Sequence, residues 1–597
     1  MNILVLFVAG VAVFALASRF YARVIGRNFG VDPAQPTPAV VKNDGRDFVP
    51  TRIHVLFAHH FSAIAGAGPI LGPTIAILYG YTPVWLWIVL GCVFFGAVHD
   101  FTAIFVSVRE GGRSMADVSR TTLGRTSFVM FILFTIVMLV LVTSNFLAAT
   151  AVSLTSMWPV EKLGLSAGQS FLKVVTAADG RVLGVIGGIA STSVVIITLL
   201  SPLLGYLIYR RKMNTVAAYM LAAAICIGSV VAGIYAPISL DPKVWMVVLS
   251  VYVMFAAVLP VWFILQPRDF INVQILYAGL FLLAAGVIIG GLQGAKMQIP
   301  AENIAQGTAR LGMIWPLLFI TVACGAISGF HALVAGGTTA KQIATEAHAK
   351  RIGYDGMLLE GVLALLVVLA LGSSLAFDDY LALVWPTAEQ AKLLPSNPIL
   401  AFSLAVGHLL DRTIHIPQAL ATVFGILLVE GFVITTLDAA VRLNRYLFEE
   451  LWRIAFGSDE RVPGVMRHAW FNSGLSVVLM AVLAFTNSFH ALWPLFGTSN
   501  QLLAALTLFV VSAWLIMHGK RAIYTLVPAV FILVTTCASL WLLVKKYYSV
   551  GNTLLTAAAI VLAVLTLSMV AFTIFRLPKV LRGERAAAKN GKDAVSA

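Results

Sequence analysis

Apolar runs long enough to cross a lipid bilayer recur along almost the whole chain, from Asn2 to Phe575. A bilayer-spanning helix needs about 20 apolar residues, and no long polar stretch separates these runs. The composition agrees, because 60% of the 597 residues are hydrophobic, 11% are charged and the mean hydropathy is +0.93. Soluble domains would need more polar surface than this. The sequence therefore predicts an all-α integral membrane protein.

We predict about fifteen crossings from the lengths of the apolar runs. The predicted spans cover residues 2–18, 53–80, 83–108, 127–157, 183–209, 213–235, 244–265, 272–294, 312–340, 354–377, 416–438, 471–486, 489–517, 523–544 and 551–575. One further apolar piece, Ile399–Leu410, is too short to cross a bilayer, and we expect an interfacial or re-entrant element there.

The basic residues orient this set of spans, because Lys and Arg are enriched in cytoplasmic loops. With the N-terminus outside, the predicted inner loops hold 30 of the 40 Lys and Arg. No basic residue precedes the first apolar run, whereas Arg19, Arg23 and Arg27 follow it, so Ala15-x-Ala17 is interpreted as part of a retained helix. We expect a bacterial inner-membrane protein with a periplasmic N-terminus and a cytoplasmic C-terminus. The +14 charge favours anionic lipids over nucleic acid as a partner.

Glycines and prolines interrupt two of the apolar spans. The second span contains Gly66, Gly68 and two prolines between residues 59 and 73, and the ninth span is broken around 324–338. Proline removes a backbone donor and glycine adds backbone freedom, so continuous helices are not expected there. The two spans have opposite predicted directions, which is the pattern of an inverted-repeat transporter with its site near the bilayer midplane. The alternative is that the small residues only allow close helix packing.

Ionisable side chains inside these spans are costly and are usually functional. His59 and His60 lie in the second span, and Asp100 lies late in the third, where pairing with a loop Arg is the alternative to a transport role. Glu360 and Glu430 are candidate proton carriers, because a carboxylic acid in a low-dielectric site can hold and release a proton reversibly. We favour Glu430, since it lies deeper in its span.

Further polar groups have open interpretations. Asp438 and Arg442 are spaced i, i+4 on one helix face and predict an ion pair, with a gating switch as the alternative. Asn500 and Gln501 follow a Pro/Gly interruption, where their amides line the substrate path or bond a neighbouring helix.

The sequence carries no HExxH, Walker or GxSxG motif, so no enzyme is predicted. The histidines His59, His60 and His331 leave one rival open, a membrane-embedded redox or metal subunit. A passive channel is a second rival. The four cysteines are scattered singly, which favours neither disulfides nor a zinc ribbon.

Seven ordered motifs resemble those of the carbon starvation protein A family of bacterial transporters. They are Asp47–Thr51 leading to His59–Phe61 and Gly66–Pro69, Leu265–Asn272, Cys324–His331, Thr338–Gln342, Ile352–Gly361, Thr435–Arg442 and Leu492–Gln501. The resemblance covers most of the chain, although Ala58, Thr498 and Ser499 depart from the family pattern. It implies a fold like that of the amino acid, polyamine and organocation transporters, with proton-coupled uptake of peptides or pyruvate. It also adds Gln266 and Asp269 to the candidate path.

These observations combine into one hypothesis of alternating access. Residues 1–52 form an N-terminal helix and basic loop, 53–575 a single transporter domain, and 576–597 a basic tail. Half-helix N-termini at the two breaks receive a substrate carboxylate through free N–H groups, and Lys341 or a loop Arg adds charge from the cytoplasmic side. No resident cofactor or metal is expected. The coupling ion is H⁺, with Na⁺ as the alternative, and the oligomeric state is left open.

Overall fold

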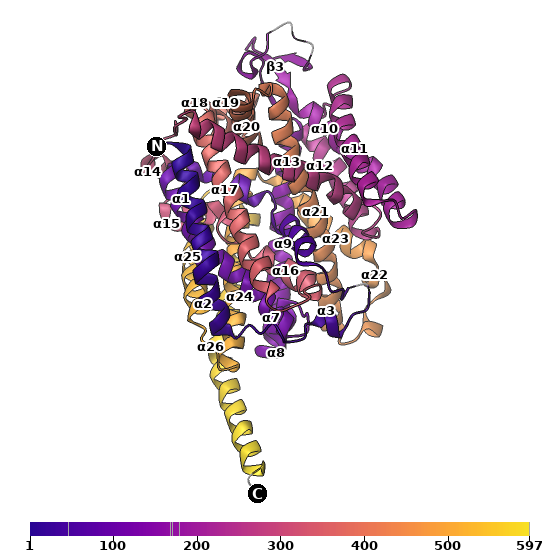
Figure 1. Ribbon diagram of the computed structural model, residues 1–597, viewed down its shortest axis with the longest axis vertical. Helices are drawn as coiled ribbons and strands as arrows, with labels where there is room; N and C mark the ends of the chain where they lie inside the picture. The colour runs from indigo at the N-terminus through magenta and orange to yellow at the C-terminus, as the bar shows by residue number, and fades with distance from the viewer. Residues whose placement is uncertain (46, 167–168, 170, 178, 596–597) are drawn as a thin grey trace.

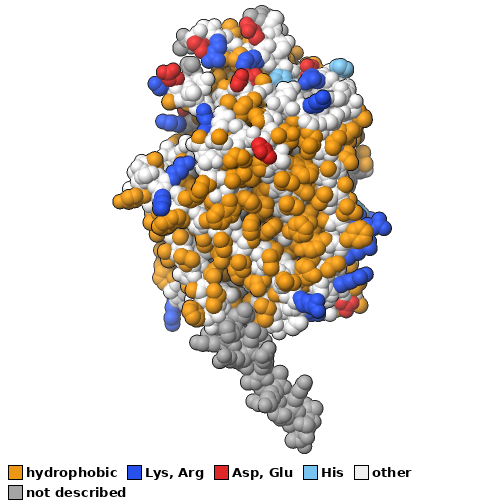
Figure 2. Space-filling model, turned by 90° about the vertical axis from the view of Figure 1, so that its left-hand side faces the viewer, with side chains coloured by type: hydrophobic (Ala, Val, Ile, Leu, Met, Phe, Trp, Pro, Cys, Tyr) orange, Lys and Arg blue, Asp and Glu red, His pale blue; other side chains and the backbone are white. Residues whose placement is uncertain are grey.

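The protein is a bundle of long helices with one small sheet at an end (Figure 1). The computed structural model describes residues 1–597 apart from 46, 167–168, 170, 178 and 596–597, and the side chains of 393, 459 and 576–595 are also left undescribed. Hydrophobic side chains cover the middle of the face shown in Figure 2, and Lys and Arg lie mainly toward its two ends. This surface is that of a multi-pass membrane protein.

The described residues contain 13 helices long and apolar enough to cross a membrane, or 14 when one bent pair is included. The one remaining predicted span, 244–265, coincides with α12 (Pro242–Val258), an apolar helix of 17 residues. The helices that follow the predicted spans are α1–α2 (Ile3–Phe29), α4 (Ile53–Ile64) with α5 (Gly68–Ala76), α6–α7 (Tyr81–Arg109), α9 (Arg125–Leu154), α10 (Ile186–Gly205), α11 (Thr215–Tyr235), α12, α13 (Leu265–Leu292), α15 (Ile314–Val322) with α16 (Phe330–Gly337), α17 (Asp355–Ser374), α21 (Gln418–Phe456), α23 (Ala469–Thr486), α24 (Phe489–Met517), α25 (Ile523–Ser549) and α26 (Thr553–Val595).

Short elements mark the two ends of the bundle. One end, here called the sheet end, carries the N-terminus and an antiparallel sheet of order β1-β3-β2 (Figure 1). Its elements are β1 (Met157–Pro159), β2 (Val174–Thr176), β3 (Val182–Val185), α14 (Ile304–Leu311), α18 (Phe377–Val384) and α19 (Ala388–Leu393). The opposite end, here called the tail end, carries α3 (Pro38–Val41), α8 (Met115–Thr122), α22 (Gly464–Arg467) and the C-terminus.

Two predicted spans end too early. The first helix continues past residue 18 to Phe29 through the basic stretch, and α21 continues past 438 to Phe456. Both extensions contain several charged residues, so apolar content alone did not include them; helix propensity carries each helix beyond its membrane segment.

The short apolar piece near residue 400 does not cross the bundle, as predicted. It belongs to α20 (Pro398–Ile414), and the residue before this helix and the first residue of the next helix both bond to the segment next to the sheet. Asn397 donates to Ser156 Oγ at 2.7 Å, and Gln418 donates to the carbonyl of Lys162 at 2.7 Å. Helix α20 therefore begins and ends at the sheet end.

Both predicted breaks are present, and the two broken spans run in opposite directions. Helices α4 and α5 meet at 46°. The ninth predicted span is interrupted between Val322 and Phe330, where a short 3₁₀ turn, η6 (Ala323–Gly325), begins with Ala323 at φ 45°. At the tail end Thr51 N–H bonds to the carbonyl of Gln342 at 3.0 Å, and at the sheet end Tyr79 Oη bonds to that of Gly312 at 2.8 Å.

The two breaks pack directly against one another, which requires glycine on the α5 side. A Cβ at Gly68 would lie 2.5 Å from Cys324 Sγ, and a Cβ at Gly72 would overlap the carbonyl group of Val322. Irregular backbone at membrane depth is tolerated when it is buried in protein, as it is here. The small residues thus serve both predicted purposes, because they break the helices and let them approach.

We predict that Gly72→Ala destabilises the protein by about 1–3 kcal/mol, because the added methyl group meets backbone that cannot move aside. Thermal unfolding in detergent measures the effect. The matched control is Gly337→Ala, where an added Cβ meets nothing within 4 Å. Equal melting temperatures for the two variants would contradict the close packing of the breaks.

Candidate functional site

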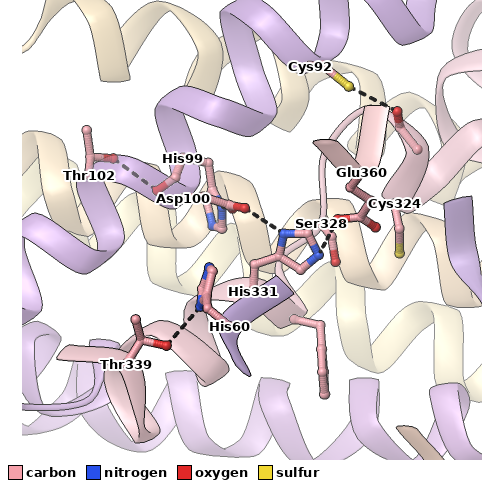
Figure 3. A network of polar contacts seen from close by, with 12 residues as sticks. His60, Cys92, His99, Asp100, Thr102, Cys324, Ser328, His331, Thr339 and Glu360 are labelled. Atoms are coloured by element: carbon pink, nitrogen blue, oxygen red, sulfur yellow. Dashed lines mark hydrogen bonds and ion pairs between the residues drawn. The ribbon is translucent and has the colours of Figure 1, made fainter. Parts of the chain in front are cut away.

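A cluster of ionisable side chains lies where both broken spans meet α7 (Ala97–Arg109) and α17. This histidine–carboxylate cluster consists of His60, His99, Asp100, His331 and Glu360 (Figure 3). Asp100 is its centre: its two carboxylate oxygens lie 2.7 Å from His99 Nδ1 and 2.7 Å from His331 Nδ1. The other ring nitrogen of His331 lies 3.2 Å from Glu360 Oε2. The three ionisable groups Asp100, His331 and Glu360 therefore form a continuous chain.

All five side chains of the cluster are at most 1% exposed. His60 Nδ1 lies 2.8 Å from Thr339 Oγ1, which ties α4 to the tail-end half of the other broken span. Several polar atoms of the cluster keep unused hydrogen-bonding capacity, namely both oxygens of Glu360 and the Nε2 atoms of His60, His99 and His331. The 3.2 Å contact between His331 and Glu360 is close enough for an ion pair but is not aligned as a hydrogen bond.

The alternative considered for Asp100, pairing with a loop Arg, is not observed, because His99 and His331 take both of its oxygens. Among the described residues, no group of three or more His, Cys, Asp and Glu is arranged to hold a metal ion.

The break between α15 and α16, here called the second break, finds its hydrogen-bond partners on α24 and on the neighbouring π-helical turn η3 (Cys92–Gly96). Gly329 and Phe330 N–H groups bond to the backbone and side-chain oxygens of Asn500 at 3.1 and 3.0 Å. Gln501 donates to the carbonyl of Phe319 at 2.7 Å, and Cys92 lies 3.1 Å from that of Gly325. Asn500 and Gln501 thus bond a neighbouring helix, the second of the two roles considered for them.

The N-terminus of α16 is therefore already capped. The first N–H groups of this half-helix were expected to be free for a substrate carboxylate, but Asn500 occupies them. Asn500 also bonds to Ser328 and Cys324, which fixes its amide in place. In this conformation a carboxylate cannot bind there without displacing Asn500.

A second polar centre, the Arg268 cluster, lies between α12, α13 and α21. Arg268 Nη1 lies 2.8 Å from Asp438 Oδ2, and both groups bond to the hydroxyl of Tyr252. Arg268 Nη2 lies 3.3 Å from Thr435 Oγ1, which in turn donates to Asp269 at 2.9 Å. Arg268 is 2% exposed and Asp438 is fully buried. A desolvated ion pair of this kind requires both partners, because either charge alone would be left uncompensated.

The expected ion pair between Asp438 and Arg442 is absent. Asp438 pairs with Arg268 instead, and Arg442 donates to the carbonyls of Ala256 and Leu259 at the end of α12. Spacing of i, i+4 places two residues on one helix face, but here each side chain reaches a different neighbouring helix. Arg268 itself was counted among the cytoplasmic-loop residues, and its burial within α13 corrects that count.

Glu430, the favoured proton carrier, lies apart from the histidine–carboxylate cluster. Its side chain is fully buried and faces the hydroxyls of Thr150 and Ser153 on α9. It lines a cavity of about 10 Å³ together with Arg268, Asn272 and Gly431. Asn272 and Gly431 also line a neighbouring cavity of about 20 Å³, together with Asp269. A single water needs about 10–15 Å³, so each cavity has room for about one water molecule.

Four other predicted path residues lie outside both clusters. His59 and Gln266 are exposed. Lys341 lies at the tail end, 5.8 Å from the centre of the Phe48 ring. Gly66 lies at the first break, where an added Cβ would be 3.2 Å from Thr436 Oγ1 on α21.

Sequence reasoning did not select His99, Arg268 or Tyr252. His99 precedes Asp100 directly, so an intramembrane His-Asp pair was the available signal. Arg268 follows a proline and stands beside Asp269, which resembles a loop. No signal marked Tyr252, since an aromatic residue in an apolar helix is ordinary.

The fold and these clusters define a polytopic helical membrane protein with buried charge beside two oppositely directed broken spans, an arrangement typical of secondary transporters. The family model for carbon starvation protein CstA matches residues 2–393 and 378–539. The chain is 31% identical to the peptide transporter CstA of Campylobacter jejuni, over 94% of this chain and 82% of that protein. It is 30% identical to the pyruvate/proton symporter BtsT of Escherichia coli, over 91% and 81%. The chain belongs to the CstA family.

A solved structure, a mutant of the Eremococcus coleocola manganese transporter, matches 90% of this chain and 99% of its own with 11% identity and a TM-score of 0.49.

We predict that Arg268→Met destabilises the protein by about 3–5 kcal/mol, because it leaves Asp438 buried without its partner. The double variant Arg268→Met/Asp438→Leu recovers part of this loss, since it removes both charges. Thermal unfolding in detergent measures both. The control Arg211→Met changes an exposed arginine and stays within about 0.5 kcal/mol. A double variant less stable than the single one would contradict a simple ion pair.

Proposed function

We propose that this protein is a proton-coupled uptake transporter for small carboxylate-bearing nutrients, either peptides or pyruvate, and not an enzyme. The proposal depends on one structural observation, the burial of the histidine–carboxylate cluster between two broken spans of opposite direction. Relatives in the family include proteins named for peptide transport and for pyruvate/proton symport. A membrane carrier that couples to protons needs buried groups that can gain and lose them.

The small volumes of these two cavities support a carrier over a channel. They are lined by charged and amide side chains from α13 and α21, and the larger also includes Ser62 of α4. A continuous pore would need an open passage, whereas a carrier closes around its site between openings to each side. Substrate entry to the larger cavity then requires α4 to move away from α13 and α21.

Uptake into proteoliposomes tests this function. Purified protein is reconstituted and supplied with labelled pyruvate or small peptides, with and without an inwardly directed pH gradient. We expect accumulation above the outside concentration only with the gradient, because downhill proton entry supplies the free energy. A matched sodium gradient at constant pH is the control for the coupling ion.

The remaining outcomes separate the rivals. Uptake that ignores the pH gradient and never exceeds the outside concentration indicates a channel. Stoichiometric metal or haem in the purified protein indicates a redox or metal subunit. Each of these results would overturn the proposed function.

We also propose that the tail end faces the cytoplasm of a bacterial inner membrane, with the N-terminus in the periplasm. The predicted inner loops, which hold most of the Lys and Arg, lie at this end, and basic loops are retained on the cytoplasmic side.

Reporter fusions test this orientation. We expect alkaline phosphatase to be active when fused after Val160 and inactive when fused after Arg120 or at the C-terminus, because the enzyme requires the periplasm. A fluorescent protein at the C-terminus is the converse control. Active phosphatase at the C-terminus would contradict the assignment.

A further inference from the structure

The charge balance of the histidine–carboxylate cluster differs from that of the Arg268 cluster. In the Arg268 cluster a permanent cation offsets Asp438. Asp100 and Glu360, by contrast, form ion pairs only with histidines among the described residues, and no Lys or Arg lies within pairing distance of either. Histidine is cationic only when it has bound a proton. The negative charge at this site can therefore be offset only by protons or by an added cation.

The contacts of His331 fix how many protons the chain holds. Nδ1 lies 2.7 Å from Asp100 and Nε2 lies 3.2 Å from Glu360, and a ring nitrogen without a proton would place its lone pair against a carboxylate. We therefore count one proton on each ring nitrogen. With these two protons, the chain of one imidazole and two carboxylates carries a net charge of −1. One more proton, on Glu360 Oε1, makes it neutral. In a site excluded from water, neutrality is strongly favoured.

We propose that the Asp100–His331–Glu360 chain is the coupling-proton site of this transporter, and that the transported proton binds Glu360. The inference rests on the proposed function. It assigns the coupling role to Glu360 and not to Glu430, which faces hydroxyl groups on α9 and has no histidine in contact.

The position of His331 links this proton to the movement of a broken span. His331 belongs to α16, whereas Asp100 and Glu360 belong to the continuous helices α7 and α17. When Glu360 is ionised, it attracts the imidazolium of His331 and holds α16 against α17. When Glu360 is protonated, that ion pair is lost and α16 is free to move away. Proton binding and the release of α16 are then the same event.

Other titratable groups that face the chain are His99 of α7, His60 of α4 and the thiols of Cys92 and Cys324. His99 Nδ1 lies 2.7 Å from Asp100, and neither thiol can carry a positive charge. None of these supplies a permanent positive charge, so the proton count above is unchanged.

The test compares two transport modes in proteoliposomes for Glu360→Gln, an uncharged side chain of the same shape. Exchange of labelled for unlabelled substrate at equal pH requires the transporter to move but no net proton flux. Gradient-driven accumulation requires the proton. We expect Glu360→Gln to retain exchange and to lose all response to the pH gradient. A pH-sensitive dye inside the vesicles should report acidification with substrate for the wild type and none for the variant.

Two companion variants sharpen this comparison. Glu110→Gln changes a carboxylate at the tail end that bonds to Trp514, and we expect it to keep both modes. Glu430→Gln should keep the ratio of gradient-driven uptake to exchange, whatever its exchange rate. Gradient response retained in Glu360→Gln, or lost from Glu430→Gln while exchange continues, would overturn the proposal.

Asp100→Asn provides a second test that applies even if Glu360→Gln does not fold. It removes one negative charge, so the chain is neutral without the transported proton, and gradient-driven uptake should shift toward acid pH by about one unit or more. An unchanged pH profile would overturn the proposal. If the wild-type protein neither exchanges nor accumulates pyruvate or peptides, the proposed function itself fails, which is a different result from these.

Discussion

Polar groups that leave a regular helix inside a bilayer must find their partners within the protein, and much of this structure follows from that constraint. The second break exposes carbonyls and N–H groups, and Asn500, Gln501 and Cys92 bind them. These partners come from α24 and η3, so the break depends on helices far away in the sequence. The small residues of α5 matter for the same reason, because they let one break cover the other.

The two polar clusters meet the same constraint in different ways. The Arg268 cluster joins a permanent cation to Asp438 and surrounds the pair with hydroxyl groups, so its charge is fixed. The histidine–carboxylate cluster has only protonatable cations, so its charge depends on the protons it holds. A fixed ion pair suits a structural joint between helices. A variable one suits coupling, because its charge can change without any residue leaving the membrane.

The sequence predicted the elements of this fold better than their contacts. The apolar runs located the spans, the Gly and Pro residues located both breaks, and the short length of Ile399–Leu410 predicted that α20 does not cross. The pairing of Asp438 with Arg442 was wrong, because helical spacing reports which residues share a face and not which helix packs against it. The same limit hid Arg268, whose burial depends on α12 and α21. The chain from Asp100 to Glu360 joins three helices, so no local pattern could reveal it.

The antiparallel arrangement of the broken spans divides them into two pairs. Helix α4 lies with α16 through the contact between His60 and Thr339, and α5 lies with α15 where Gly72 meets Val322. Each pair combines halves of different spans, and only the residues around Ala65–Ala67 and Ala323–Gly329 connect one pair to the other along the chain. The tail-end pair, α4 and α16, can therefore tilt about these two short segments while the sheet-end pair, α5 and α15, keeps its packing. One side of the membrane can open without any helix having to bend elsewhere.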